Sequence, residues 1–261
     1  MVVFVMIDGL RPDALAVTQC PHLKSVIARG ASTLRARSSF PPITLPCHTS
    51  IFHSVPSSRH GIVNNDWLPM SRPLPGLFEQ IKAAGMRSAA FYNWEQLRDV
   101  SRPGSLTYSY YCDTSHDPDG DDVTVDVAVR VLTRDPYDFA FVYMGNVDNA
   151  GHDYGWMSDG YLAQAERADR ALGTLLAALP IETPLLLQAD HGGHDKNHGQ
   201  DIPEDMTIPW MAAGPGIRRG YTISGAVSLL DTAPTLARLL GIAPHAEWEG
   251  RCVEEIFDLP A

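Results

Sequence analysis

PLLLQADHGGHDKNHG, residues 184–199, joins a predicted strand to a group of potential metal ligands. The apolar run Leu185–Leu187, bounded by Pro184, predicts a short buried strand, and Gly192-Gly193 predicts a turn after it. The polar groups at or just past the strand end are Asp190, His191, His194 and His198. Carboxylate and imidazole together form the ligand set of zinc-like divalent metals. Taken alone, the stretch also fits a polar loop with solvated histidines; the rest of the chain favours the metal site.

Length and charge limit the classes of partner. The chain has 261 residues and a formal net charge of −11. That length suits one large α/β domain with its own core, and no linker or internal repeat divides it. The negative charge disfavours a nucleic-acid polymer as partner. A small phosphorylated substrate remains compatible, because bound divalent ions reverse the local field.

The cysteines and the N-terminus indicate the compartment. Cys20, Cys47, Cys112 and Cys252 are widely spaced and form no CxxC pair, so we expect reduced thiols and no disulfide framework. The apolar run at residues 2–7 is too short for a membrane span and lacks the features of a signal peptide. We therefore expect a cytoplasmic protein that does not associate with membranes.

Two more apolar runs end in acidic or imidazole groups. Val2–Ile7 predicts a buried parallel strand that ends at Asp8. Asp138–Met144 predicts another, followed by Asp148 and His152 in a loop just past its end. In open α/β sheets, ligands bind at the carboxyl edge of the strands. Three separate strands that deliver such groups to one edge predict a single functional site.

The segment Phe40–Ser50, FPPITLPCHTS, is the second informative stretch. Its prolines favour an extended approach, Thr44 is placed like a helix N-cap, and Pro46 suits a first helical turn. A hydroxyl at a helix N-terminus lies beside free amides, where phosphate oxygens are favoured. An ordinary capping threonine is the alternative interpretation of this stretch taken alone.

Alternating helices and strands fill the rest of the chain. The predicted helices cover residues 21–29 with Gly30 as C-cap, 74–84, 122–133, a helix capped by Ser158 that carries apolar residues from 162 to 179, and 231–240 with Gly241 as C-cap. The further predicted strands cover residues 31–39, 87–92 and 206–213, and residues 93–120 are expected to form an irregular surface excursion. The pattern predicts a mostly parallel sheet layered by helices on both faces.

These motifs resemble the alkaline phosphatase superfamily, and most of all its type I phosphodiesterase/nucleotide pyrophosphatase family. The matching segments are Asp8-Gly9, Pro41–His48 around Thr44, His60–Asn65, Asp148 with His152 and Gly155, Asp190–Gly192, and His198-Gly199. The resemblance implies an alkaline-phosphatase-like three-layer α/β/α sandwich with a mostly parallel central sheet. We expect residues 1–261 to form one minimal catalytic domain without a large inserted cap.

The resemblance also implies two zinc ions, with Mn²⁺ or another divalent metal as alternatives. It assigns one ion to Asp8, Thr44, Asp190 and His191, and the other to Asp148, His152 and His198. Thr44 would be the nucleophile, and Asn65 would donate a hydrogen bond to a non-bridging phosphate oxygen beside the Thr44 amide. The expected activity is cleavage of a phosphodiester or pyrophosphate bond through a phosphothreonine intermediate.

The chain departs from the family pattern in two places. In the family, the last histidine usually lies far beyond the Asp-His-Gly motif, whereas here His198 follows it closely. His194 competes for the same role as a metal ligand, and we favour His198 because a glycine follows it. Nucleotide-cleaving relatives often carry an aromatic residue after the nucleophile, where this chain has Leu45. Trp67, Trp94, Tyr154 and Trp156 are candidates either for a leaving-group pocket or for ordinary packing.

Other functions remain as alternatives to the phosphodiesterase. A phosphomonoesterase or phosphonate hydrolase would use the same metal site, but a monoesterase usually needs an extra cation, for which no arginine stands in a clear motif. A non-catalytic metal-binding protein would need neither Thr44 nor Asn65. A sulfatase is rejected because Cys47 lacks the Cys-x-Pro-x-Arg context. The oligomeric state is left open by the sequence.

Overall fold

The strand that begins at the second residue forms the centre of the molecule. In the computed structural model, which describes residues 1–70 and 72–258, β1 (Val2–Ile7) is completely buried. It pairs in parallel with β5 (Phe139–Met144) on one side and with β6 (Leu185–Gln188) on the other. All three strands are buried along their whole length, and apart from Tyr143 and Gln188 they consist of aliphatic, Phe and Met residues, as is typical of strands covered by helices on both sides.

Within the described residues, the sheet has eight strands in the order β4-β3-β5-β1-β6-β7-β2-β8. The outer strands are β2 (Gly30–Arg37), β3 (Ser88–Tyr92), β4 (Tyr108–Tyr111), β7 (Thr207–Ala213) and β8 (Tyr221–Thr222). Only β7 runs against its neighbours, and it is antiparallel to both β6 and β2. The sheet is therefore mostly parallel, as the sequence predicted.

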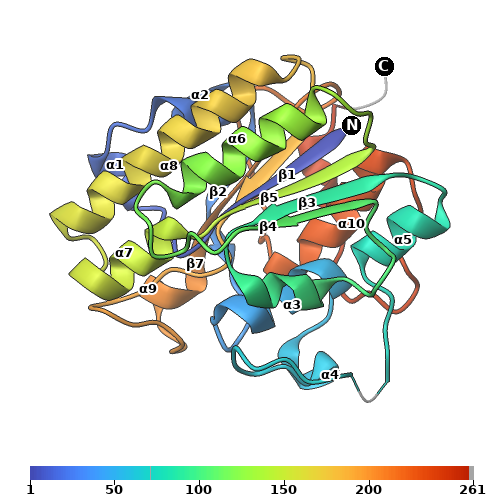
Figure 1. Cartoon of the computed structure of the whole chain (residues 1–261), viewed down its shortest axis with the longest axis horizontal. Coiled ribbons are helices and arrows are strands. Elements are labelled where there is room, and N and C mark those ends of the chain that lie inside the picture. Colours follow the sequence, from blue (N-terminus) through green and yellow to red (C-terminus); the bar gives the residue numbers. More distant parts are fainter. Residues whose placement is uncertain (71, 259–261) are drawn as a thin grey trace.

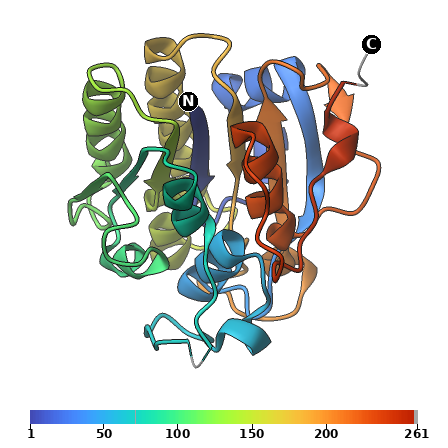
Figure 2. The ribbon, with the colours of Figure 1, turned by 90° about the vertical axis from the view of Figure 1, so that its right-hand side faces the viewer.

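Helices cover both faces of this sheet (Figures 1 and 2). One layer contains α2 (Pro21–Arg29), α6 (Gly120–Leu132) and α8 (Asp159–Ala178), and the other contains α3 (Thr44–His53), α5 (Leu77–Ala83) and α10 (Thr232–Leu240). The remaining helices are α7 (Asn146–Tyr154), which packs against α8, and the single-turn helices α1 (Ala14–Val17), α4 (Ser57–His60) and α9 (Pro203–Met206). There are also 3₁₀ segments at Glu95–Val100, Leu229–Asp231 and Glu254–Ile256. The predicted three-layer α/β/α architecture is confirmed.

Two helix ends behave as expected. Ser158 caps α8 by accepting a hydrogen bond from the Tyr161 amide at 3.3 Å. Gly241 ends α10 in the left-handed conformation, with φ of 70°.

Gly30 is the C-cap of α2, as predicted, although its backbone is not in the left-handed conformation of a typical glycine cap. Gly30 follows α2 but has extended backbone angles and already belongs to β2. Glycine is needed there for close packing, because a Cβ atom would lie 2.1 Å from the carbonyl oxygen of Ala212 in β7. The residue marks the contact between two strands that are far apart in the sequence.

Residues 93–120 are more ordered than predicted. They contain the 3₁₀ segment Glu95–Val100 and β4, which is the edge strand of the sheet beside β3. The sequence Tyr108-Ser-Tyr-Tyr111 has the aromatic content of a strand but too short a run for a clear period. An edge strand with one exposed face gives a weak hydrophobic signal.

Three residues predicted at a cap or in a loop are helical instead, and all three bear on the candidate site. Thr44 is the first residue of α3 and not its N-cap; the cap is Ile43, whose carbonyl accepts the first helical hydrogen bond from Cys47 at 2.9 Å. Asp148 and His152, which we expected in a loop, lie on α7. Four positions separate them, so both project from one helix face.

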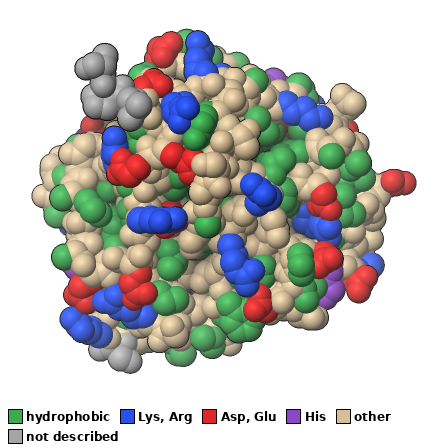
Figure 3. All heavy atoms as spheres, turned by 180° about the vertical axis from the view of Figure 1, so that it is seen from behind, with side chains coloured by type: hydrophobic (Ala, Val, Ile, Leu, Met, Phe, Trp, Pro, Cys, Tyr) green, Lys and Arg blue, Asp and Glu red, His purple; other side chains and the backbone are tan. Residues whose placement is uncertain are grey.

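The distribution of surface charge and the character of the helices are the last features of the fold. Basic and acidic side chains are interspersed over the face shown in Figure 3. Among the described residues, no helix combines the length and the apolar character needed to cross a bilayer.

Candidate metal centre

The carboxyl ends of β1 and β6 bring together three side chains that we call the inner set: Asp8, Asp190 and His191. All three are completely buried. His191 Nε2 lies 3.3 Å from Asp8 Oδ1 and 3.5 Å from Asp190 Oδ2. The two strands are neighbours in the sheet, so the polar residues that end them must meet.

A second group, the outer set, consists of Asp148, His152 and His198. Asp148 Oδ2 lies 3.5 Å from His152 Nε2, and Asp148 Oδ1 lies 3.6 Å from His198 Nε2. The outer set is more accessible than the inner set, since the side chains of Asp148 and His152 are 15% and 39% exposed. Helix α7 and the loop after β6 therefore build this group together.

The two sets adjoin each other. The imidazole rings of His191 and His198 stack with centroids 3.8 Å apart. Gly9 follows Asp8 with φ of 67°, and a Cβ atom on it would lie 2.9 Å from the Cα atom of Asp148. A glycine at this position therefore allows β1 and α7 to approach closely enough for the sets to share one site.

The three histidines of the two sets share one hydrogen-bonding pattern at their ring nitrogens. The Nδ1 atoms of His152, His191 and His198 lie 3.0, 2.8 and 2.8 Å from the carbonyl oxygens of Lys196, Gly192 and Pro42, respectively. A carbonyl oxygen only accepts, so each Nδ1 carries the proton and donates it. Each Nε2 therefore presents a lone pair to the carboxylates, which is the arrangement of metal-ligating histidines.

Each carboxylate keeps one buried oxygen without a hydrogen-bond partner among the described residues: Asp8 Oδ1, Asp148 Oδ1 and Asp190 Oδ2. Burial, with repulsion from Asp190 and Asp148, raises the pKa of Asp8 well above its ordinary value. Burial, with repulsion from Asp148, raises the pKa of Asp190 to about 7. Unpaired buried oxygens and like charges are costly unless cations compensate them. Two divalent ions would compensate both costs, so the donor sets fit the metals that the sequence predicts.

Thr44 and Asn65 lie at the border of the inner set. Thr44 Oγ1 is 3.2 Å from His191 Nε2, and its side chain is directed to the site by its position at the start of α3. The amide of Leu45 donates to Asn65 Oδ1 at 3.0 Å, which orients the Asn65 side chain beside the same helix end. The structure thus brings all eight predicted site residues to one edge of the sheet.

Tyr143 is a residue of this site that the sequence did not indicate. It lies in β5, is buried, and its hydroxyl donates a short hydrogen bond to Asp8 Oδ2. That contact orients the Asp8 carboxylate so that Oδ1 lies 3.3 Å from His191 Nε2. A tyrosine one residue before the end of an otherwise apolar strand, next to the strand that carries Asp8, was the available signal.

The competing histidine lies outside both sets, and the candidate aromatic residues differ in burial. His194 belongs to neither set, and its Nδ1 lies 2.7 Å from Asp205 Oδ1. Trp156 is buried beneath the outer set, where its Nε1 donates to the carbonyl of Gly9 at 3.0 Å. Trp67 and Tyr154 are 47% and 62% exposed, and Trp94 is partly buried against the core.

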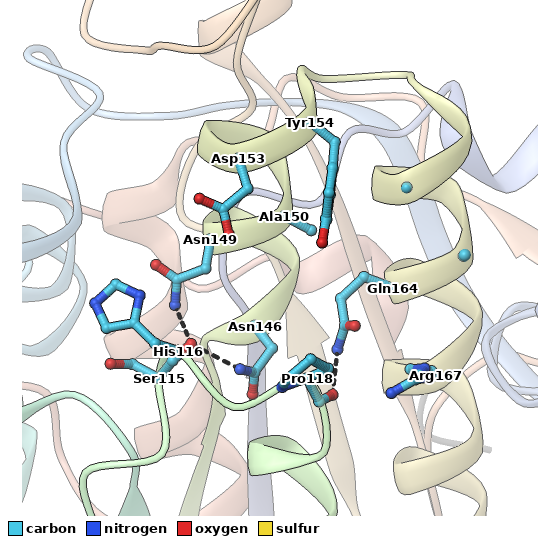
Figure 4. A pocket seen from close by; sticks show the side chains of 12 residues that line it. Ser115, His116, Pro118, Asn146, Asn149, Ala150, Asp153, Tyr154, Gln164 and Arg167 are labelled. Atoms are coloured by element: carbon cyan, nitrogen blue, oxygen red, sulfur yellow. Dashed lines mark hydrogen bonds between the residues drawn. The ribbon is translucent and has the colours of Figure 1, made fainter.

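A pocket of about 250 Å³ lies behind α7 and is distinct from the two sets (Figure 4). Asn146 and Ala150, which help to line it, lie two positions on either side of Asp148, and two positions correspond to about 200° around a helix. The Nδ2 atoms of Asn146 and Asn149 donate to the Ser115 carbonyl and tie α7 to the loop before α6. This face of α7 supports the helix and carries no member of either set.

The arrangement of ligands agrees with a family match over most of the chain. Residues 2–207 match the family model for type I phosphodiesterase / nucleotide pyrophosphatase. The chain belongs to this family. Type I phosphodiesterases are hydrolases of the alkaline phosphatase superfamily, and metal dependence is a property of the family.

Curated relatives share the superfamily at low identity. A phosphopentomutase from Symbiobacterium thermophilum is 27% identical over 168 residues, which cover 64% of this type I phosphodiesterase chain and 39% of the mutase. An arylsulfatase K from Danio rerio is 33% identical over 92 residues, 31% of this chain and 18% of that protein. The chain thus matches less than half of the length of these relatives.

Solved structures show the same fold. One is the murine ectonucleotide pyrophosphatase/phosphodiesterase 5, in an inactive form in complex with AMP. It superposes with a TM-score of 0.79 at 18% identity, and the superposition covers 98% of this chain and 99% of the murine chain. A phosphonate monoester hydrolase from Silicibacter pomeroyi has a TM-score of 0.78 at 15% identity and covers 100% of this chain and 77% of its own. At these identities the similarity establishes the fold alone.

Proposed function

We propose that this protein is a two-metal phosphodiesterase that cleaves a small phosphodiester or pyrophosphate through a phosphothreonine intermediate on Thr44. The observation that carries the proposal is the donor geometry. Three carboxylates with unpaired buried oxygens and three imidazole Nε2 atoms converge beside the Thr44 hydroxyl. Metal binding alone would not require a hydroxyl at a helix N-terminus in this position.

The inner set with Thr44 would hold one ion, and the outer set would hold the other. Aspartate oxygen and histidine nitrogen suit zinc, and manganese is the alternative. When bound, the two ions would supply positive charge to the attacking and leaving oxygens and lower the pKa of the Thr44 hydroxyl.

The residues of the chain have separable roles in the proposed reaction. The Thr44 oxygen attacks phosphorus, the bond to the leaving oxygen breaks, and water then hydrolyses the phosphothreonine. The first amides of α3 make no intrahelical hydrogen bond, so the Thr44 amide is free to donate to a phosphate oxygen. Asn65 is held by its Oδ1 atom, which leaves its Nδ2 to donate to a second non-bridging oxygen.

The substrate that fits these features is small. The net charge of −11 opposes a polyanionic partner, whereas two divalent ions would favour a single phosphate group. Leu45 is completely buried, so the residue after Thr44 has no side chain available to stack on a base. The murine relative was captured with AMP, which makes a nucleotide ester a natural test compound.

Metal analysis combined with a substrate panel tests the proposal. Protein reconstituted with zinc or manganese should contain about two ions per chain. It should hydrolyse bis(4-nitrophenyl) phosphate and a nucleotide 4-nitrophenyl ester with higher kcat/KM than 4-nitrophenyl phosphate or an aryl phosphonate. A tenfold preference for the monoester or the phosphonate would assign the site to a monoesterase or phosphonate hydrolase. Two bound ions without turnover of any compound would indicate a non-catalytic metal-binding protein.

A further inference from the structure

The segment from His191 to Gln200 carries His198, and it forms a tight return. The amide of His194 donates to the carbonyl of Asn197, and the amide of Asn197 donates back to the carbonyl of His194, both at 2.9 Å. Asp195 at the tip has φ of 47°. This return brings the ring of His198 back onto that of His191 within seven positions of the chain.

Asp205, which lies outside this segment, contacts it at three points. Asp205 in α9 is completely buried. Its Oδ1 atom lies 2.7 Å from His194 Nδ1, and its Oδ2 atom accepts from the Gln200 amide at 2.8 Å. Its carbonyl oxygen accepts from the Gly192 amide at 2.8 Å. Asp205 therefore contacts the start, the middle and the end of the return.

His194 is engaged at both ring nitrogens. Its Nε2 lies 3.1 Å from Gln200 Nε2, on the side opposite the Asp205 contact. The side chain of His194 is 22% exposed and that of Asp205 is fully enclosed. A buried carboxylate is stable only when donors satisfy it, so this pair has a reason to persist apart from any ligand.

We infer that Asp205 and His194 are positioning residues that hold His198 in the outer set. The inference rests on the proposed function, because it assigns the pair a role in metal binding. Neither residue touches the outer set. They act through the backbone between Gly192 and Gln200, which fixes where His198 Nε2 lies relative to Asp148.

The inner set gives an internal comparison. Its members Asp190 and His191 come directly from the end of β6, whose strand pairing holds them in place independently of the return. Loosening the return should therefore affect one ion and spare the other. A general loss of stability would weaken both.

Zinc binding to the full chain, measured by calorimetry after removal of metal, tests this assignment. His194→Ala removes the middle contact at a partly exposed position, and Asp205→Asn removes the charge while keeping the shape. His198→Ala identifies which binding event belongs to the outer set. Asp201→Asn is the matched control, because Asp201 lies in the same loop but forms an exposed ion pair with Arg37.

We expect His194→Ala and Asp205→Asn to weaken outer-set binding about 10–100-fold, as loss of a residue behind a metal ligand typically does. The metal-free melting temperature should fall, because a buried hydrogen bond is lost, but inner-set binding should change little, and Asp201→Asn should match the wild type in both measurements. Binding at both sites within threefold of wild type in both variants would overturn the inference. So would an equal loss at both sites, which indicates stability alone. A wild-type protein that binds no second ion would instead refute the two-metal proposal itself, and with it this role.

Discussion

Thr44 is the residue on which the proposed chemistry depends most directly. Thr44→Ala should remove nearly all diester hydrolysis, because no hydroxyl remains to attack phosphorus. The six carboxylate and imidazole side chains of the two sets are left intact, so metal content should persist. The measurement is kcat/KM for the best diester together with elemental analysis. Turnover within tenfold of wild type in the metal-replete variant would contradict the covalent mechanism and favour direct attack by water.

Two further variants test the roles of the Thr44 hydroxyl and the Asn65 amide separately. Thr44→Ser should keep part of the activity, since it retains the hydroxyl and loses only the methyl group. Asn65→Ala should cost roughly 10²–10³-fold, the usual effect of losing one donor to developing charge.

Glu255 predicts a pH dependence of stability away from the metal centre. Its carboxylate accepts from the Ser224 amide and hydroxyl, the Gly225 amide and the Tyr221 hydroxyl. These hydrogen bonds, led by the Ser224 amide, lower the pKa of Glu255 from 4.5 to about 2. A lowered carboxyl pKa means that the stabilisation is complete above pH 4.5 and is lost as the pH falls towards 2.

Urea unfolding of wild type and Glu255→Gln at several pH values measures this contribution. The variant should be less stable at pH 6, and the difference should shrink between pH 4.5 and 2. The exposed carboxylate Glu182, changed to Gln, controls for the loss of one charge. A difference that stays constant down to pH 2 would show that the carboxylate is not the cause.

At the residue scale, the sequence predicted the membership of the two sets better than their geometry. Asp8 and Asp190 directly follow or nearly follow two buried strands, so their positions do not depend on loop conformation. Their proximity therefore follows from the apolar runs that identify those strands. Which of His194 and His198 faces Asp148 depends on the hydrogen bonds of Asp205, a contact between segments that no local pattern encodes. Tyr143 was missed for the same reason, since its partner Asp8 lies on another strand.

At the scale of elements, α7 carries a conflict between helix propensity and packing. Gly151 lies within α7, where alanine would normally stabilise the helix by about 1 kcal/mol. A Cβ atom at Gly151 would lie 2.5 Å from the ring of the buried Trp156. Trp156 also packs against His152 and His198, with ring centroids 5.0 and 5.8 Å away, so it has no room to yield without moving the outer set.

Gly151→Ala should therefore lower the free energy of unfolding by ~1–3 kcal/mol, the usual range for overpacking. It should also weaken zinc binding at the outer set. Gly173→Ala in α8 is the control: its Cβ would lie 2.4 Å from Nε2 of the half-buried His22, and this far end of the imidazole ring can turn away. Chemical denaturation of both variants decides between propensity and packing, and a stabilised Gly151→Ala would refute the packing argument.

Long apolar elements were predictable and short or mixed ones were not. The runs at β1, β5 and β6 identify buried strands because burial on both faces requires continuous apolar sequence. The sequence of α7 gives a weak helical signal, because Asn146, Asn149 and Gly151 have low helix propensity. Packing against α8 and the Asn146 contacts to the preceding loop overcome that propensity.

At the scale of the whole molecule, the two sets differ in depth. The inner set is completely buried, whereas His152 in the outer set is 39% exposed. A chelator should therefore remove one ion quickly and the other slowly. Each proposed ion would bind only the folded chain, so the melting temperature should fall in two steps as metal is removed.

Release of zinc into a colorimetric chelator, followed over time, provides the measurement. We expect two phases of equal amplitude in the wild type, and only the slow phase in His198→Ala. A single phase in the wild type, or a fast phase that survives in His198→Ala, would contradict the assignment of the accessible ion to the outer set.

The order of strands in the sheet has a consequence for how the chain acquires its structure. β1 precedes its partners β5 and β6, which lie at residues 139–144 and 185–188, and β2 precedes β7 at 207–213. Contacts between such distant segments require the closure of large loops, and the entropy lost in closing them slows folding. A nascent chain that ends before residue 139 would hold β1 without either neighbour, and one that ends before residue 207 would hold β2 without β7. Such unpaired strand edges are prone to aggregation. We therefore expect its solubility during synthesis to depend on chaperones that shield the first strands until the second half of the chain has emerged.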